Sequence, residues 1–287
     1  MSSVLLVAHH ERPEAAALVR TAADWLRLHG HQPFLNPADA EPLDLLDLSA
    51  DLPPGGADLA VSLGGDGTVL RTVKMLGGAG TPIIGVNVGL LGYLTEVDPP
   101  DLCTSLARWF AGPDGGDWQL DERMLLEITV RPAGEGPVAT YTALNEGVVE
   151  KMEPGHTVRL QVSIDGTPFT SYAADGLILA TPTGSTAYSM SARGPVVSPR
   201  LRAVLLTPVS PHMLFDRTLV LDPTERVDVE VIGHRSATLS VDGQPACSLE
   251  EGDRVSVVPS EQVARFVRFA QRRFHQILKA KFGLTDR

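Results

Sequence analysis

The sequence predicts an α/β domain followed by an all-β domain. Three observations lead to this prediction. The first part of the chain alternates short apolar runs with segments of helical spacing, whereas short runs rich in Val, Ile, Leu and Thr fill the remainder. The 27 glycines and 22 prolines among 287 residues recur without a period, which is typical of a chain with many tight turns.

The N-terminal part shows strand–helix alternation. Apolar runs predict buried strands at residues 3–8, 57–63 and 82–88. Pro13 opens a helical stretch that ends at Gly30, and helical spacing recurs at residues 69–76 and 98–110. Because strands that alternate with helices form parallel sheets covered by helices, we expect a Rossmann-like α/β domain over residues 1–115.

The C-terminal part is predicted to be an antiparallel β-sandwich. Its apolar runs lie at residues 125–130, 140–143, 158–164, 176–180, 203–207, 218–221, 227–232, 237–241 and 254–258. Asp165-Gly166, which follows one of these runs, is the signature of a type I′ hairpin turn. We therefore expect a β-rich domain over residues 116–265 and a helical tail over residues 266–287, with its helix at residues 269–282.

Charge and cysteine content narrow the class of protein. Lys and Arg number 24 against 35 Asp and Glu, and the net charge of −11 argues against nucleic acid as the main partner. No apolar run approaches the roughly 18 residues of a membrane span, and no basic segment precedes the first apolar run as in a signal peptide. Cys103 and Cys247 are isolated thiols without metal-ligand spacing. We expect a cytoplasmic protein with neither a membrane nor a nucleic acid as partner.

The segment with the clearest chemical meaning is a glycine-rich loop between a predicted strand and a predicted helix. Its residues are Gly64, Gly65, Asp66, Gly67 and Thr68. We expect the glycines to turn the chain with positive φ and to leave backbone N–H groups uncovered for a phosphate. Thr68 is predicted to cap the helix. A simple strand-to-helix turn is the competing interpretation.

Asp66 favours a catalytic interpretation of this loop. A carboxylate repels a bound phosphate unless it holds Mg²⁺ or takes a proton from a reacting hydroxyl, which points to phosphoryl transfer. The loop is neither a Walker A sequence, because no Gly-Lys-Ser/Thr follows, nor a dinucleotide fingerprint, because G-x-G-x-x-G is absent. The predicted chemistry is therefore that of a phosphotransferase of another type.

Three further segments have polar residues next to apolar runs. Asp175 precedes an apolar strand that leads into residues 181–189, where Ser, Thr and Tyr supply hydroxyls for ribose and phosphate groups. Asn145-Glu146 interrupts an apolar strand pattern, so these side chains need partners. For both segments an ordinary loop or edge position is an equally good interpretation. For Asp242-Gly243-Gln244 a purely structural hairpin turn is the better one.

Taken together, these residues resemble a known family. GGDGT at residues 64–68, Asn145-Glu146, Asp175 with TPTGSTAYS, Pro211-His212 and Asp242-Gly243-Gln244 occur in the order found in the bacterial-type NAD kinases. The stretch GVNVGLLGYLTEV at residues 85–97 is similar to the segment after the glycine motif in that family. The resemblance implies a two-domain enzyme that transfers the γ-phosphoryl group of ATP, with Mg²⁺, to the 2′-hydroxyl of the adenosine ribose of NAD. It also implies a homodimer or homotetramer.

The resemblance assigns roles to individual residues. Asp66 matches the general base, with Gly67 beside the ligand, and Asn145 and Glu146 match residues that hold adenosine. Asp175 matches a substrate-binding carboxylate. The matches to a wall of the dinucleotide pocket are Thr186, Ala187, Tyr188 and Ser191. Plausible ligand-facing positions are Arg71, Tyr93, His156, Ser210, His212 and Gln244.

The sequence also departs from the family pattern. Met213-Leu214-Phe215 follows His212 where the family commonly has Leu-Ser, and Ala173 lacks a basic side chain that some members place there. The alternatives to an NAD kinase are a lipid or sugar kinase that shares the GGDGT loop, and a dinucleotide-binding sensor without catalysis.

Overall fold

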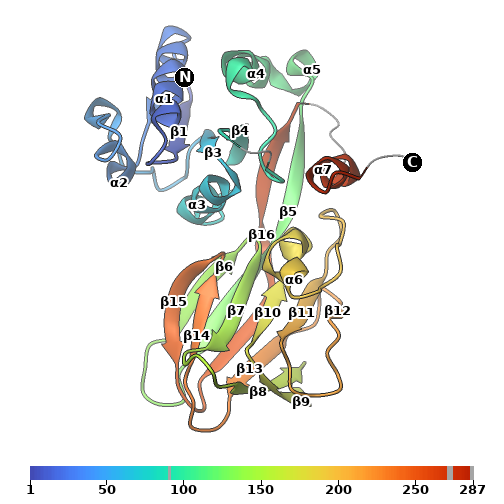
Figure 1. Ribbon diagram of the computed structural model, residues 1–287. Helices are drawn as coiled ribbons and strands as arrows, with labels where there is room; N and C mark the ends of the chain where they lie inside the picture. The colour runs from blue at the N-terminus through green and yellow to red at the C-terminus, as the bar shows by residue number, and fades with distance from the viewer. Residues whose placement is uncertain (90–91, 270–273, 285–287) are drawn as a thin grey trace. The chain divides into compact units, whose positions relative to one another are not determined.

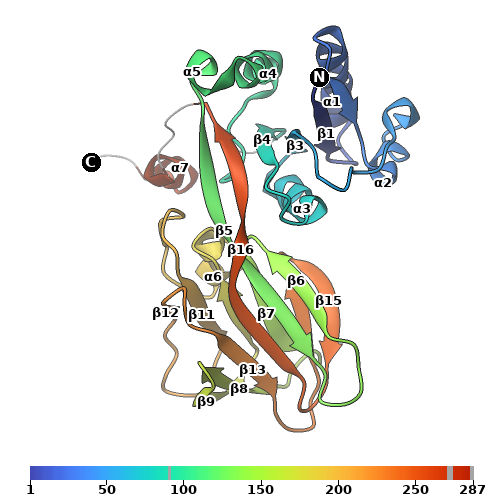
Figure 2. The ribbon, with the colours of Figure 1, turned by 180° about the vertical axis from the view of Figure 1, so that it is seen from behind.

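The structure, a computed structural model, describes residues 1–89, 92–269 and 274–284. The chain forms two compact units (Figure 1): unit 1 comprises Met1–Glu122 with Ala264–Arg287, and unit 2 comprises Arg123–Val263. The predicted boundary lies near residue 115 with a separate tail from residue 266, whereas here Ala264–Arg287 groups with unit 1. Strands β5 (Gln119–Arg131) and β16 (Arg254–Arg268) pair with each other and contribute residues to both units (Figure 2).

Unit 1 contains a parallel sheet, as predicted. Its order is β2-β1-β3-β4, and the end of β16 adds a parallel pair with β4. The strands are β1 (Ser3–Ala8), β2 (Gln32–Phe34), β3 (Leu59–Gly64) and β4 (Pro82–Asn87). Strands β1 and β3 are buried almost throughout, which is why they appear in the sequence as continuous apolar runs.

Helices surround this sheet. The principal ones are α1 (Pro13–Leu28), α3 (Asp66–Leu76) and α4 (Leu102–Phe110), with short elements α2 (Pro37–Ala40), η1 (Leu46–Leu48), η2 (Pro99–Asp101) and α5 (Gly112–Gly116). Apolar side chains of α1 and α4 share one core cluster with those of β1 and β3. β2 and α2 are absent from the prediction because they are too short to show a period.

Unit 2 consists of two antiparallel sheets, which confirms the predicted β-rich fold. One contains β8 (Val158–Ile164), β9 (Thr167–Ala174), β13 (Val227–Val231) and parts of β16 and β5, with β6 (Ala139–Ala143) beside β5. The other has the order β12-β11-β10-β7-β14-β15. Its strands are β7 (Glu146–Lys151), β10 (Gly176–Ala180), β11 (Val204–Val209), β12 (Leu219–Leu221), β14 (Ala237–Val241) and β15 (Gln244–Leu249).

Side chains of both sheets meet in a single core cluster. Leu160 and Val229 come from the first sheet, and Leu177 and Leu239 from the second. The type I′ turn predicted at Asp165-Gly166 is confirmed, because the φ angles of these residues are 48° and 75°. Two short helical turns, η3 (Gly184–Thr186) and α6 (Tyr188–Ser191), follow β10.

The C-terminal helix α7 spans Phe274–Lys281 and is shorter than predicted. Phe269 directly follows β16, and residues 270–273 of the predicted helix lie outside the described residues. Within the described part of the chain, none of the helices has the length and apolarity that crossing a bilayer requires.

Candidate functional site

The glycine-rich loop joins β3 to α3, but its glycines act differently from the prediction. None of Gly64, Gly65 and Gly67 has a positive φ. A Cβ on Gly64 would lie 2.1 Å from the Thr68 hydroxyl oxygen, so this position requires glycine for space. A Cβ on Gly65 or Gly67 would meet no atom of the described residues within 4 Å. The backbone of the loop is therefore open to a ligand at these two residues.

The start of α3 also differs from the prediction. Gly65 precedes the helix and Asp66 is its first residue, so Thr68 lies inside the helix and is not its cap. The acidic side chain in the first turn compensates for the modest helix propensity of Asp-Gly-Thr, because negative charge is favourable at a helix N-terminus. The N–H of Thr68 donates to the Gly65 backbone oxygen at 3.0 Å, whereas the first N–H groups of the helix, those of Asp66 and Gly67, have no carbonyl partner within it, which makes this end suitable for an anion.

Asp66 is held by a second segment of unit 1. Its carboxylate oxygens accept hydrogen bonds from the backbone N–H of Tyr93 at 2.8 Å and of Leu94 at 2.9 Å. Gly92 allows this close approach, because a Cβ there would lie 2.2 Å from Asp66 Oδ1. Each carboxylate oxygen can accept more than one hydrogen bond, so the clamp leaves acceptor capacity for a ligand.

Tyr93 lies beside this carboxylate. Burial, and to a smaller extent the charge of Asp66, raises the pKa of the Tyr93 hydroxyl. The Nζ of Lys281 in α7 lies 4.1 Å from the centre of the Tyr93 ring, a cation–π contact. The predicted residues Asp66 and Tyr93 are therefore brought together, and Lys281, which sequence reasoning missed, lies against the Tyr93 ring.

Arg71 has partners other than a ligand. Its terminal nitrogens donate to the Asp39 carboxylate and to the backbone oxygen of Ala8, and one of them lies 2.9 Å from His10 Nε2. Asp39 is 2% exposed. Because a buried carboxylate needs a charged partner, Arg71 stabilises this part of unit 1. Its predicted role toward phosphate stays a prediction, and it would require Arg71 to leave Asp39.

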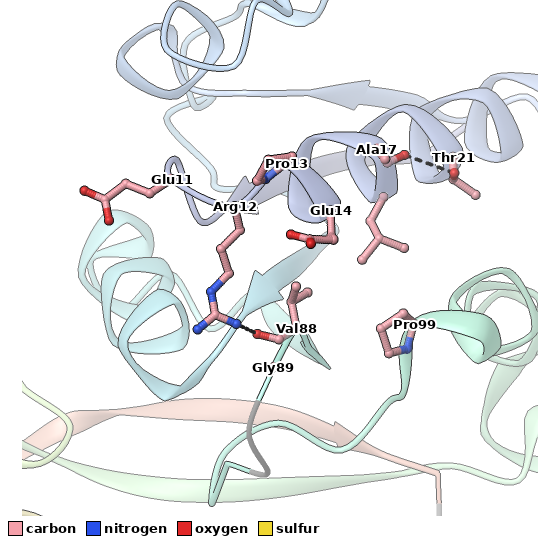
Figure 3. A pocket seen from close by; sticks show the side chains of 10 residues that line it. Glu11, Arg12, Pro13, Glu14, Ala17, Thr21, Val88, Gly89 and Pro99 are labelled. Atoms are coloured by element: carbon pink, nitrogen blue, oxygen red, sulfur yellow. Dashed lines mark hydrogen bonds between the residues drawn. The ribbon is translucent and has the colours of Figure 1, made fainter.

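A pocket of unit 1 lies beside the start of α1 and the chain after β4 (Figure 3). Glu11, Arg12, Glu14 and Gly89 are among its lining residues, and Arg12 donates a hydrogen bond to the backbone oxygen of Val88. None of the predicted site residues lines it. The pocket has two carboxylates and one guanidinium, which already donates to the backbone, so it has no preference for an anion.

In unit 2, Asn145 and Glu146 form the corner between β6 and β7. The backbone oxygen of Asn145 accepts the N–H of Thr181 at 2.8 Å, and that of Leu144 accepts the Thr181 hydroxyl at 2.6 Å. Gly184 packs against the same corner, because a Cβ there would lie 2.2 Å from the Asn145 backbone oxygen. Two sequence-distant predicted segments are thus in direct contact.

A methyl group at Gly184 should damage this corner. We expect Gly184→Ala to lower the free energy of unfolding by about 2–3 kcal/mol, because the clash is with backbone and overpacking of this kind cannot relax through a rotamer change. Urea denaturation measures the effect. Gly134→Ala is the matched control, since its Cβ would meet nothing within 4 Å and its φ is not positive. Equal effects of the two substitutions would contradict the prediction.

Glu146 is a buried carboxyl group. Glu146 is only 6% exposed, and its Oε2 has no hydrogen-bond partner among the described residues. Burial, followed by the nearby carboxylate of Asp242, raises the pKa of Glu146 to about 8, against a smaller opposing effect of a hydrogen bond from the backbone N–H of Tyr188. The structure thus places Glu146, Asp242 and Tyr188 in one cluster.

Asp175 lies between β9 and β10 with a basic partner that sequence reasoning missed. Lys151 Nζ lies 2.6 Å from Asp175 Oδ1. This hydrogen bond is the main cause of a lowered Asp175 pKa, and the Ser210 hydroxyl and His212 add to it. The antiparallel pairing of β7 with β10 brings Lys151 beside Asp175. Lys151 supplies a positive charge there, which the side chain of Ala173 lacks.

The hydroxyl-rich segment after β10 divides into two groups. Thr181, Ser185 and Ser189 are buried and hydrogen-bonded within the protein, so they stabilise the turn. The remaining predicted residues, Thr186, Ala187, Tyr188 and Ser191, are partly or fully exposed. Burial, followed by the charges of Glu150 and Asp175, raises the pKa of Tyr188. Tyr188 therefore lies near both the Asp175 and the Glu146 groups.

Four further predicted residues are exposed. His156 precedes β8, Ser210 and His212 follow β11, and Gln244 begins β15 directly after the Asp242-Gly243 turn. Across the described ranges, no three His, Cys, Asp or Glu side chains are grouped closely enough to hold a metal ion by themselves.

Comparisons with known proteins agree over the whole chain. Residues 39–113 match the model of the ATP-NAD kinase N-terminal domain, and residues 144–269 match that of the ATP-NAD kinase C-terminal domain. An NAD kinase of Heliobacterium modesticaldum is 40% identical over 289 residues, covering 98% of each chain. One of Syntrophotalea carbinolica is 34% identical over 290 residues, covering 100% of each.

Two solved structures are also similar. The yeast NADH kinase complexed with NADH has a TM-score of 0.86 and 26% identity, and the match covers 100% of this chain and 89% of that one. An NAD kinase from Archaeoglobus fulgidus in complex with ATP has a TM-score of 0.69 and 26% identity, with coverage of 98% and 96%.

Proposed function

Since the chain belongs to the ATP-NAD kinase family, we propose that it transfers the γ-phosphoryl group of ATP to the 2′-hydroxyl of the adenosine ribose of NAD. The ribose oxygen forms a bond to the γ-phosphorus, the bond from that phosphorus to the β,γ-bridging oxygen breaks, and ADP leaves with NADP as the other product. The observation that carries the proposal is the position of Asp66, in the first turn of α3 and clamped by two backbone N–H groups.

Asp66 is proposed to accept the proton of the 2′-hydroxyl. The N–H groups of Tyr93 and Leu94 fix the direction of its carboxylate, so the acceptor needs no reorganisation when the substrate binds. The open backbone at Gly65 and Gly67 and the N-terminus of α3 support a role in holding phosphate. Gly64 and Thr68 keep the loop in this conformation.

Unit 2 is proposed to recognise the adenosine part of NAD. Asn145 and Glu146 would supply hydrogen bonds, and Asp175 a carboxylate for hydroxyl groups of the substrate. Tyr188 and its neighbours at 186–191 would form an adjoining wall. Ser210, His212 and Gln244 are proposed to contribute from the surrounding loops, and His156 is the most peripheral of these assignments.

The residues fit Mg²⁺ only as an ion that arrives with ATP. Asp66 is a single carboxylate with acceptor capacity to spare, and Mg²⁺ sites of this type combine one or two carboxylates with substrate phosphates and water. When bound, the ion would neutralise charge on the transferred phosphoryl group. We also propose that the protein acts in the cytoplasm as a homodimer or homotetramer, as the resemblance implies.

The direct test is formation of NADP, detected with an NADP-specific dehydrogenase. We expect product from NAD with ATP and Mg²⁺, and none when Mg²⁺ is chelated. Parallel reactions with polyphosphate as donor, or NADH as acceptor, define the substrate range. Phosphorylation of diacylglycerol or fructose 6-phosphate in preference to NAD would overturn the proposal, and so would NAD binding without any product.

A further inference from the structure

The Asp242 side chain makes more contacts than a hairpin turn requires. Asp242 and Gly243 join β14 to β15 with φ angles of 48° and 75°. The carboxylate accepts three consecutive backbone N–H groups: Leu144 at 2.8 Å, Asn145 at 2.7 Å and Glu146 at 3.1 Å. The N–H of Asp242 in turn donates to the Glu146 backbone oxygen at 2.9 Å.

The chain contains a second turn that serves as a comparison. Asp165-Gly166 has the same two residue types and the same φ angles of 48° and 75°. There the Asp165 side chain is exposed and accepts the N–H of Arg226 at 2.9 Å. In a type I′ turn of this kind the carboxylate thus needs no more than one bond to a neighbouring loop, whereas the Asp242 carboxylate accepts three consecutive N–H groups, more than the turn itself requires.

The three N–H groups lie at a break between strands. β6 ends at Ala143 and β7 begins at Glu146, so the corner has no regular ladder of its own. A carboxylate can accept all three N–H groups at once because it has two oxygens and no donor. From the other side, Thr181 binds the backbone oxygens of Leu144 and Asn145. The corner is therefore fixed through both its donors and its acceptors.

We propose that Asp242 is a positioning residue of the kinase, which sets the direction of the Asn145 and Glu146 side chains toward the adenosine part of NAD by holding the backbone N–H groups of residues 144–146. This inference rests on the proposed function. Its consequence is that loss of the carboxylate weakens NAD binding specifically, because the side chains that contact NAD remain but are misdirected.

Asp242→Asn tests the proposal, with Asp165→Asn as the matched control. Asparagine adopts positive φ readily, so both turns should persist, whereas only the Asp242 variant loses acceptors for the corner. We expect its KM for NAD to rise about tenfold or more, with the KM for ATP within about twofold of wild type. The control variant should change neither constant by more than about twofold.

A double-mutant cycle separates positioning from general destabilisation. Calorimetric NAD affinities are compared for wild type, Asp242→Asn, Asn145→Ala and the double variant. Because Asp242 is proposed to act through the corner that carries Asn145, its effect should shrink by at least about threefold in the Asn145→Ala background. Fully additive effects would show that Asp242 acts elsewhere.

If Asp242→Asn does not fold, Asp242→Gly and Asp165→Gly repeat the comparison, because glycine accepts the turn φ without strain. Circular dichroism checks folding. An active wild type with an unchanged NAD constant in the Asp242 variants would overturn the positioning role. A wild type that forms no NADP would instead overturn the proposed function.

Discussion

Asp66→Asn is expected to lower kcat for NADP formation by about a thousandfold or more while NAD still binds. The amide oxygen is a poor proton acceptor, and removing a general base costs about 10²–10⁴ in rate. The contacts proposed for adenosine come from unit 2, so calorimetry should find NAD affinity within about threefold of wild type. Near-wild-type turnover of this variant would show that Asp66 is not the general base.

The same substitution also disturbs the clamp, which calls for a control. An asparagine offers one oxygen to the two N–H groups of Tyr93 and Leu94, whereas aspartate offers two. Gly92→Ala keeps the carboxylate but places a methyl group against Asp66 Oδ1. We expect this variant to retain about a tenth of the wild-type rate, because displacement by a fraction of an ångström is less harmful than loss of the base. Equal losses of rate in Asp66→Asn and Gly92→Ala would mean that the position of the Asp66 carboxylate, and not its basicity, determines the rate.

Much of the fold could be predicted because a buried element shows a pattern of apolar residues within its own segment of the sequence. The strands of unit 1 are buried on both faces and the helices carry one apolar face, so each element has its own period in the sequence. The apolar pattern is weaker in three other strands. β2 is short, and most side chains of the hairpin strands β9 and β15 are partly or fully exposed. Their formation depends on pairing with a neighbouring strand.

The sequence suggested candidate site residues, whose roles stay predictions, but it did not suggest their contacts. Glycine spacing identified the loop at residues 64–68, yet the reason for Gly64 is the size of Thr68 and not a positive φ. The partner of Arg71 is Asp39, and that of Asp175 is Lys151. These pairs form only when segments distant in the sequence become neighbours in the fold, α2 and α3 for the first pair and β7 and the start of β10 for the second, and no local pattern encodes them.

Glu146→Gln is expected to make the free energy of unfolding less dependent on pH. The pKa of Glu146 is about 8 in the folded protein and near the ordinary value of 4.5 in the unfolded chain. Between these values the folded state keeps a proton that the unfolded state has lost. Rising pH therefore favours the unfolded chain, and stability falls by about 1.4 kcal/mol per pH unit in this window and levels off above it.

Urea denaturation of wild type and Glu146→Gln at several pH values isolates this contribution, since most other titrating groups cancel in the difference. The stability advantage of the glutamine variant should grow from about pH 5 to about pH 8 and then stay constant. Glu127→Gln, at an exposed position of β5, is the control and should follow the wild-type curve. A difference that does not change with pH would mean that Glu146 is ionised in the folded protein.

The protonation state has a consequence for binding. A neutral Glu146 can donate a hydrogen bond, whereas an ionised one only accepts, and glutamine resembles the neutral form in shape and charge. The glutamine variant should therefore bind NAD within about threefold of wild type at neutral pH, and should keep that affinity above about pH 8, where wild type weakens. Burial and the neighbouring carboxylate of Asp242 keep Glu146 neutral, and both are features of the corner itself. The protonated carboxyl group that would donate is therefore present before NAD binds.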